Sequence, residues 1–204
     1  MMHPVPISDQ SFLAVVAILE RVMSLSVKFK LALREVLYET VYDKDSRILQ
    51  SGRVQDRVWL LLSGLAREVT LDELSLKERT SWFWLEEDFL CTNPGFFSRD
   101  PSEQTIEMLE RSRVVVISYQ NWHALLDAFS ETELLTERLR RACDRARLVH
   151  AEEIKTLSTD ERYLSRRKLL ENLFRRTKQK YVAEMMGMAP DTLGKLKGKY
   201  GDLR

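Results

Sequence analysis

One stretch decides how the C-terminal part of this 204-residue chain folds: QKYVAEMMGMAPDTLGKLKGKY, residues Gln179–Tyr200. Its first eight residues, Gln179–Met186, place apolar side chains at helical spacing and predict a short helix. Gly187 follows directly, and glycine tolerates the positive φ that commonly ends a helix. Pro190 suits the first turn of a new helix, because its missing N–H group has no partner to lose there. The stretch therefore predicts two short helices joined by a tight turn.

The second of these helices has two unlike faces. Leu193 and Leu196 are expected to face inward, and the outward residues are polar or basic. This arrangement is typical of a helix-turn-helix that binds DNA, although an ordinary helical hairpin has the same spacing. The residues expected in the major groove are Pro190, Asp191, Thr192 and Lys195. The residues expected at phosphates are Lys178, Lys180, Lys197 and Lys199.

Charge is distributed unevenly along the chain. Residues 158–204 hold 12 Lys and Arg against 6 Asp and Glu, a net charge of +6. Residues 1–157 hold 20 against 25, a net charge of −5. A basic segment on an acidic body suggests a polyanionic partner such as double-stranded DNA. A solvated helix face would give the same counts, so the charge alone does not decide between them.

A long helix is expected over residues 131–157, because no Pro or Gly interrupts them. A helix of this length with one narrow apolar stripe is more stable when a partner helix covers the stripe than when the helix is isolated. The pattern therefore favours a homodimer. The alternative is a helix packed on its own domain. Ser158 and Glu161 then form an expected capping box, which places a domain boundary before residue 158. The stripe consists of Leu135, Leu139, Ala142, Ala146, Val149 and Ile154.

The first 130 residues combine short helices with short strands. Helices are expected near Phe12–Met23, capped by Ser8 or Asp9, and over Val27–Leu37. β-Prone runs separated by turn residues then predict a small antiparallel barrel or roll. The expected strands are Thr40–Tyr42, Arg47–Leu49, Val58–Leu62, Ala66–Thr70, Ser81–Trp84 and Val114–Ile117. The expected fold class is thus α+β, with a β-roll and flanking helices in 1–130, the long helix in 131–157 and an all-α helix-turn-helix domain in 158–204.

Other chemistries find little support in the residues. Cys91 and Cys143 are far apart in sequence and form no metal-ligand or redox motif, and His3, His123 and His150 are scattered. We therefore expect no metal site. No run of about 18 uncharged apolar residues suggests a membrane span, and no signal peptide is visible, so a cytoplasmic protein is expected. No nucleophile–base pair or phosphate-cradling loop stands out, which argues against an enzyme.

Several further stretches occur in a characteristic order. They are VWLLLSGLAR at 58–67, EEDFL at 86–90, PS at 101–102, IEMLE at 106–110, VISY at 116–119 and ERY at 161–163. Together with the helix-turn-helix, they make the chain resemble the Crp/Fnr superfamily of bacterial transcription regulators, with a cyclic-nucleotide-binding-like sensor domain. The resemblance implies that an effector binds the roll and shifts the long helix of a homodimer, which sets two recognition helices to half-sites about one DNA turn apart. It also allows RNA polymerase as a partner.

The phosphate-binding pattern departs from the members that respond to cyclic AMP. By this resemblance, Cys91 and Thr92 stand where those members have Gly-Glu, and Ser102 stands where they have an arginine. Both charged anchors of the cyclic phosphate and ribose are missing, so we expect that cyclic AMP does not bind tightly. Arg99 and Arg113 could substitute only with a different backbone course. Any effector of this degenerate pocket is expected against Phe89, Cys91, Thr92, Ser102 and Glu103.

No cofactor is expected, because the chain has no N-terminal cysteine cluster for iron–sulfur and no placed histidine for haem. The aromatic residues are expected mostly to fill the core, with an apolar ligand pocket as the alternative. Those residues are Trp82, Phe83, Trp84, Phe89, Phe96 and Phe97. Two functions remain open: a DNA-binding regulator with an unidentified effector, or a degenerate sensor that acts by protein–protein contact without sequence-specific DNA binding.

Overall fold

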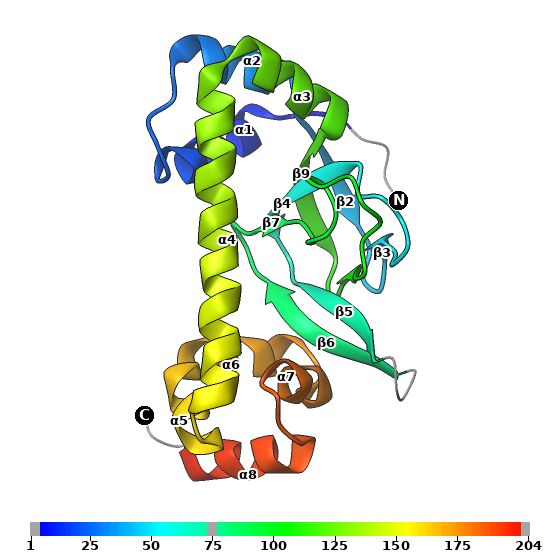
Figure 1. The fold of residues 1–204 in the computed structure, drawn as a ribbon, viewed down its shortest axis with the longest axis vertical. Helices are drawn as coiled ribbons and strands as arrows, with labels where there is room; N and C mark the ends of the chain where they lie inside the picture. Colours follow the sequence, from blue (N-terminus) through cyan, green and yellow to red (C-terminus); the bar gives the residue numbers. More distant parts are fainter. Residues whose placement is uncertain (1–4, 73–76, 201–204) are drawn as a thin grey trace.

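Nine strands form two antiparallel sheets in residues 5–72 and 77–200, the part of the chain that this computed structural model describes. The first sheet has the strands, in spatial order, β1 (Val5–Pro6), β2 (Tyr38–Tyr42), β9 (Ser112–Ser118), β4 (Arg57–Ser63) and β7 (Phe89–Leu90). The second has β3 (Arg47–Leu49), β8 (Thr105–Met108), β5 (Ala66–Asp72) and β6 (Lys77–Trp84). The two sheets make an antiparallel β-roll, and the expected α+β class is confirmed (Figure 1).

The paired strands β4 and β9 are apolar on both faces. In β4, Trp59 and Leu61 belong to the core inside the roll, whereas Val58 and Leu60 belong to the core under the N-terminal helices. The segment Val114–Ile117 of β9 alternates in the same way. A strand buried on both faces has a continuous apolar run, which explains why the sequence predicts both strands.

The sequence does not predict β1, β7 and β8, which are two to four residues long. In β8 the apolar pattern is also broken by Glu107, whose side chain is buried. Its carboxylate Oε2 lies 2.5 Å from Nε of Arg67 in β5, and Nη1 of Arg67 donates to Thr80 at 3.0 Å. The ion pair and these hydrogen bonds offset the cost of burying two charges inside a sheet.

Three short helices cover the outer face of the first sheet. They are α1 (Asp9–Glu20), α2 (Val27–Val36) and α3 (Tyr119–Ala128). Each begins after a serine whose hydroxyl accepts from a backbone N–H of the first turn: Ser8, Ser26 and Ser118. Their apolar faces join Val58, Leu60, Val115 and Ile117 in one core.

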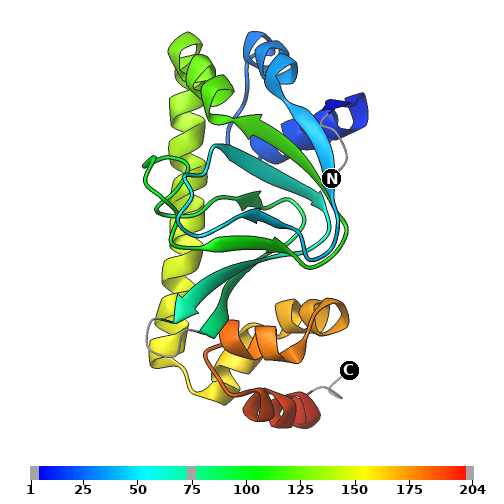
Figure 2. The ribbon, with the colours of Figure 1, turned by 90° about the vertical axis from the view of Figure 1, so that its right-hand side faces the viewer.

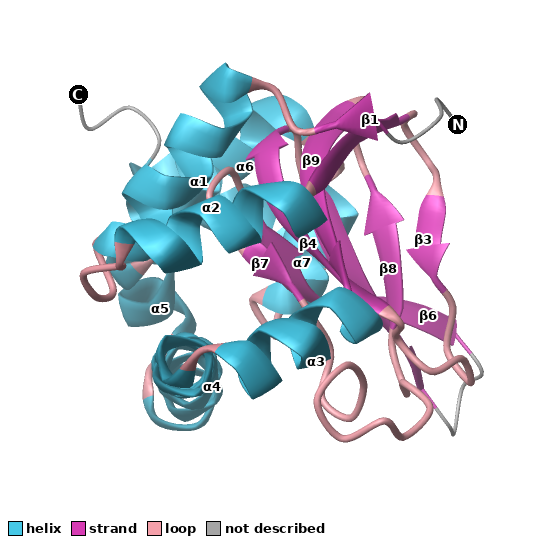
Figure 3. Ribbon diagram, turned by 90° about the horizontal axis from the view of Figure 1, so that it is seen from above, coloured by secondary structure: helices cyan, strands magenta, loops and turns pink. Residues whose placement is uncertain are grey.

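Helix α4 (Ser130–Thr156) runs along most of the height of the molecule and ends above α8 (Figure 1), and the view from above shows it standing beside the roll (Figure 3). Its apolar stripe is divided between two environments. Leu135 is buried in the core under α1–α3, and Leu139 packs against that core. Val149 and Ile154 remain 47% and 38% exposed. One side of the first part of the helix therefore packs under α1–α3, and apolar surface remains for a partner both at Leu134, which is 41% exposed, and along the later part.

Four helices close the lower end of the molecule. They are α5 (Thr159–Ser165), α6 (Arg167–Arg176), α7 (Gln179–Met185) and α8 (Pro190–Tyr200). The capping box expected at Ser158 and Glu161 is present, with both reciprocal hydrogen bonds. Gly187 has φ of +61°, the left-handed conformation expected after α7. Among the described helices, none combines the length and apolarity that crossing a bilayer requires.

Candidate nucleic-acid interface and sensor pocket

Helices α7 and α8 share a core that fixes which side of α8 faces outward. Val182 and Met186 of the α7 segment and Leu193 of α8 are fully buried in one cluster. Nε2 of Gln179 donates to the carbonyl oxygen of Pro190 at 2.9 Å, which joins the starts of the two helices. A Cβ at Gly194 would lie 3.1 Å from that amide nitrogen, so the glycine gives the glutamine room. The two helices are thus packed against each other across the turn at Gly187.

The residues expected in a DNA groove all lie on α8. Pro190, Asp191 and Lys195 are exposed and Thr192 is half-buried. Figure 2 shows α7 (orange) between the strands and α8 (red), so α8 is the element farthest from the roll. The first two turns of α8 are therefore accessible to a large partner.

The four lysines expected at phosphates are all exposed, but their surroundings differ. Lys199 is the most engaged, because its Nζ lies 2.5 Å from Oδ1 of Asp160. That hydrogen bond raises the pKa of Lys199 above its ordinary value. Lys197 lies over the ring of Phe174, at 4.7 Å from the centroid. The contacts of the other two are with α7: Lys178 with the Tyr181 ring at 5.5 Å, and Lys180 with Glu184 at 3.7 Å.

The helical domain is docked on the roll through α7. Oε2 of Glu184 accepts from the backbone N–H of Thr80 in β6 at 2.9 Å. The Tyr181 ring lies under the guanidinium of Arg67, with 3.7 Å between Cζ and the ring centroid. A cation over an aromatic face at this distance is attractive, particularly where water is excluded. Helix α7 therefore lies in the interface with the roll, whereas α8 lies outside that interface.

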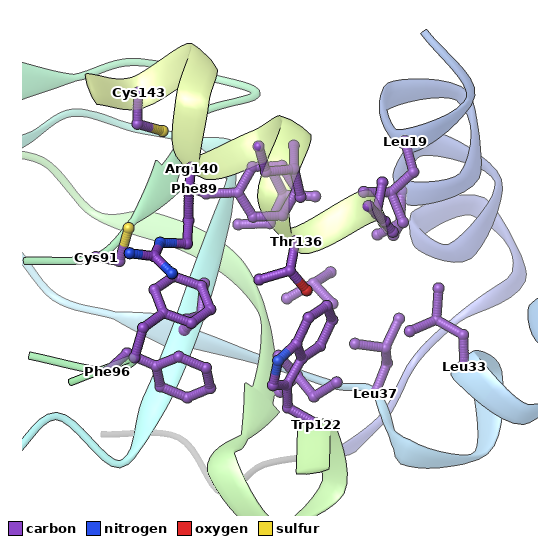
Figure 4. A pocket seen from close by; sticks show the side chains of 18 residues that line it. Leu19, Leu33, Leu37, Phe89, Cys91, Phe96, Trp122, Thr136, Arg140 and Cys143 are labelled. Carbon is purple, nitrogen blue, oxygen red and sulfur yellow. The ribbon is translucent and has the colours of Figure 1, made fainter. Parts of the chain in front are cut away.

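An almost wholly apolar cavity of about 80 Å³ lies between the first sheet and the helices α1, α2 and α4 (Figure 4). Helix α4 contributes Leu135, Thr136, Leu139, Arg140 and Cys143 to its lining. Of the six aromatic residues with two possible roles, Phe89, Phe96 and Phe97 line this cavity. Phe83 and Trp84 are buried in the other cores, and Trp82 packs against one of them. The six aromatic residues are thus divided between the lining of this cavity and the other two cores.

The residues expected to bind an effector are only partly brought together. Phe89 and Cys91 line the apolar cavity, and Cys91 and Thr92 line a neighbouring hollow of about 140 Å³. Ser102 is buried and its hydroxyl donates to the Gln104 carbonyl at 2.9 Å. Glu103 is exposed. Neither Ser102 nor Glu103 lines these two hollows, because the chain turns away between β7 and β8.

The sequence did not indicate the contribution of α4 to these hollows. Arg140, Cys143 and Arg147 line the second hollow, yet in the sequence they read as surface positions of a charged helix. Nothing in the sequence indicates that the two cysteines are neighbours, yet Cys91 and Cys143 line the same two hollows. In the described residues, no group of three or more His, Cys, Asp or Glu side chains could hold a metal ion; His3 lies outside them.

Solved structures of low sequence identity share this fold. A cyclic nucleotide-binding domain from Methylobacillus flagellatus is 15% identical, with a TM-score of 0.65 over 76% of this chain and 90% of its own. The c-di-GMP responsive global regulator CLP of Xanthomonas campestris is 14% identical, with a TM-score of 0.63 over 86% and 92%. A protein from Eubacterium rectale assigned to the Crp/Fnr family is 17% identical, with a TM-score of 0.67 over 87% and 84%.

At these identities the likeness establishes the fold alone: the chain has a β-roll of the cyclic-nucleotide-binding type with its helices. No protein-family model and no curated protein matches the sequence.

Proposed function

We propose that this chain is a DNA-binding transcription regulator of the Crp/Fnr type, which acts as a homodimer and responds to an effector other than cyclic AMP. The observation that carries the proposal is the exposed, basic α8, held by a buried apolar face at the end of the molecule farthest from the roll. The likeness to folds of bacterial regulators supports it.

Helix α8 would enter the major groove with its first turn foremost. Asp191 can accept a hydrogen bond from a cytosine amine, and Thr192 can bind either kind of base edge. Lys195 and Lys197, one turn further along, would neutralise phosphates or reach a guanine. Asp191 cannot contact guanine as an arginine does, so the preferred site should differ from that of a regulator with arginine at this place.

The proposed dimer would bring two copies of α8 to successive turns of one duplex. Its interface would use the outward face of α4, where Leu148 is 70% exposed and Val149 is 47% exposed. Leu139, which the sequence places on the same stripe, is excluded because it packs into the core of its own subunit.

The loop that follows β7 supports an effector other than cyclic AMP. The Thr92 hydroxyl donates to Oε1 of Gln55 at 3.2 Å, so this group is already used inside the protein. Nη1 of Arg99 donates to the carbonyl of Gln55 at 2.7 Å, so this guanidinium is not turned into either hollow. Without a bidentate arginine, a buried cyclic phosphate would lose its strongest partner.

The proposal is tested by selecting bound fragments from genomic DNA at low salt and measuring their affinity as ionic strength rises. We expect a steep linear fall of log affinity with log salt concentration. The double variant Lys195→Ala and Lys197→Ala should bind more weakly, with a slope smaller by about two phosphate contacts, roughly 1.8 units.

A matched control, Lys28→Ala with Lys77→Ala, removes the same charge from exposed positions on α2 and β6 and should leave binding close to that of the parent. If no genomic fragment is enriched at low salt, the regulator proposal fails and action through protein contacts remains. Equal losses in both double variants would move the interface away from α8.

A further inference from the structure

The two cysteines of the chain meet where the roll touches the long helix. Cys91 follows β7 directly, and Cys143 lies in the middle of α4. Both thiols are free, both residues are partly exposed, and both side chains line the same two hollows. Figure 4 shows them on opposite sides of the gap between the β7 segment and α4. A covalent bond between them would therefore link two elements that are otherwise held by packing alone at this point.

Solvent can reach this pair. Both cysteines line the hollow of about 140 Å³ whose other walls include Arg140, Asp144 and Arg147, and Asp144 and Arg140 are exposed. A small polar oxidant can therefore approach the sulfur atoms without opening the apolar core. Structural cysteines in a sealed core are inert, whereas reactive ones are partly exposed and lie close to positive charge.

The two thiols are unlike in acidity. The neighbouring Cys91 thiol holds the pKa of Cys143 below its ordinary value, whereas Cys143 together with burial raises the pKa of Cys91. Arg147 favours the thiolate form of both, while Asp88 and Asp144 oppose it at Cys143 and Glu68 opposes it at Cys91. Arg147 is held in place by two hydrogen bonds of 2.8 Å to Glu68. Cys143 is thus the nucleophile, and Cys91 keeps the proton that stabilises it.

We propose that Cys91 and Cys143 are a peroxide-reactive pair that forms a reversible disulfide and thereby ties α4 to the roll. In the first step the Cys143 thiolate attacks one oxygen of a hydroperoxide, the O–O bond breaks, and the leaving oxygen takes a proton to form water or an alcohol. Cys143 is then a sulfenic acid.

In the second step the Cys91 sulfur attacks the Cys143 sulfur, the S–OH bond breaks, and the hydroxyl leaves with the Cys91 proton as water. Two electrons pass from the thiol pair to the peroxide. A dithiol reductant reverses the change by exchange. This chemistry does not depend on DNA binding.

The test uses the 204-residue chain, whose sequence contains two cysteines, so a disulfide within one such chain must join them. We expect one equivalent of hydrogen peroxide at neutral pH to remove both free thiols. Proteolysis followed by mass spectrometry should then give one linked pair of peptides around residues 91 and 143, which disappears with dithiothreitol. Persistence of free thiols, a disulfide between two chains, or direct conversion to sulfinic acid would overturn the proposal.

Two variants separate the roles of the cysteines. Cys91→Ser should stop at a sulfenic acid on Cys143, which a dimedone probe labels, whereas Cys143→Ser should react with peroxide at least about tenfold more slowly than the parent. Equal rates in the two variants would contradict the assignment of the nucleophile. Circular dichroism controls the folding of each variant, and the measurement on the parent protein needs neither of them. Since its readout is mass, failure of this test leaves the proposed DNA binding untouched.

Discussion

Arg176 of α6 binds the carboxylate of Glu110 in the roll through two hydrogen bonds, from Nε to Oε1 at 3.0 Å and from Nη2 to Oε2 at 2.7 Å. The same guanidinium donates to the carbonyl oxygen of Gly64 at 2.7 Å and to Glu86 at 2.8 Å. Bidentate pairs of this kind are among the stronger polar contacts in proteins. This contact, together with α7 on β6, holds the helical domain in one orientation.

Arg176→Ala should loosen the docking of the helical domain on the roll. Charged hydrogen bonds of a mostly buried side chain are lost, so the free energy of unfolding should fall by about 1–3 kcal/mol in chemical denaturation. Amide hydrogen exchange should become faster in α6 and at the turn around Gly64. Arg175→Ala, which removes an exposed neighbour, is the control and should change neither measurement. Unchanged exchange in the Arg176 variant would show that packing alone fixes the domain.

Acid should destabilise the junction of α4 with α7 through His150. Its ring is buried, and Nε2 lies 3.0 Å from the carbonyl oxygen of Met185. Burial lowers the pKa of His150 below the ordinary 6.5. The nearby Arg166 and Arg162 lower this pKa further, whereas Glu153 opposes them. Below about pH 6.5 the unfolded chain therefore binds a proton that the folded chain binds less readily. The free energy of unfolding should be unaffected by this group above that pH and should fall as the pH decreases from 6.5 towards 5.

The measurement is a series of denaturant titrations between pH 5 and 8. His150→Gln keeps a donor for the Met185 carbonyl but does not titrate, so its stability should vary less across this range. His123→Gln changes an exposed histidine of α3 and should follow the parent. A parent curve that runs parallel to that of His150→Gln would disprove the role of His150.

Two glycine substitutions should have opposite effects. A Cβ at Gly198 in α8 would meet no atom within 4 Å, so Gly198→Ala should stabilise the helix by about 0.5–1 kcal/mol. Gly64 has φ of +116° and its Cβ would lie 2.8 Å from the Cα of Ser112, so Gly64→Ala should destabilise the roll by more than about 1 kcal/mol. Thermal unfolding of both variants beside the parent measures the difference, and a lower midpoint for Gly198→Ala would refute the first expectation.

The proposed dimer interface is tested at Leu148. Leu148→Glu places a charge on the outward face of α4, where burial against a partner helix would be costly, and should convert the dimer into monomers in sedimentation velocity. Leu13→Glu introduces the same charge on α1, at a residue that is 68% exposed, and should sediment as the parent does. A Leu148 variant that stays dimeric would remove this face of α4 from the interface.

Local sequence patterns predict a strand, cap or turn well where the residues of that segment alone determine its conformation and which side chains are buried. The strands β4 and β9, the cap at Ser158 and the turn at Gly187 follow from apolar runs, capping residues and backbone freedom, all of which are local. Strand β8 escapes prediction because the buried carboxylate of Glu107 is paired with Arg67 and Arg47, which lie on other strands. A strand that is short and contains polar residues shows no apolar pattern by which it could be predicted.

The candidate site is divided in the same way between features that local sequence patterns predict and features that they do not. The pattern of α8 predicts which residues face outward, since helical period and burial are properties of the helix and its neighbour. Cys91 and Cys143 line the same hollows because α4 crosses the roll next to β7, and no feature of either residue's neighbourhood in the sequence indicates that crossing. Only the resemblance to a family places Ser102 and Glu103 at the pocket, and in the structure neither residue lines the two hollows.

The contact of Arg176 with the roll completes a closed ring of three contacts in the molecule. The roll touches α4, α4 continues into the helical domain, and that domain returns to the roll through Arg176 and Glu184. Because the ring is closed, the geometry of one of these contacts cannot change without affecting the other two. In the proposed regulator, a signal that alters the contact of α4 with the roll must therefore either strain or release the contacts of Arg176 and Glu184. The energy needed to reorient α8 would then be set at a place remote from both the cavity and the proposed DNA-binding face.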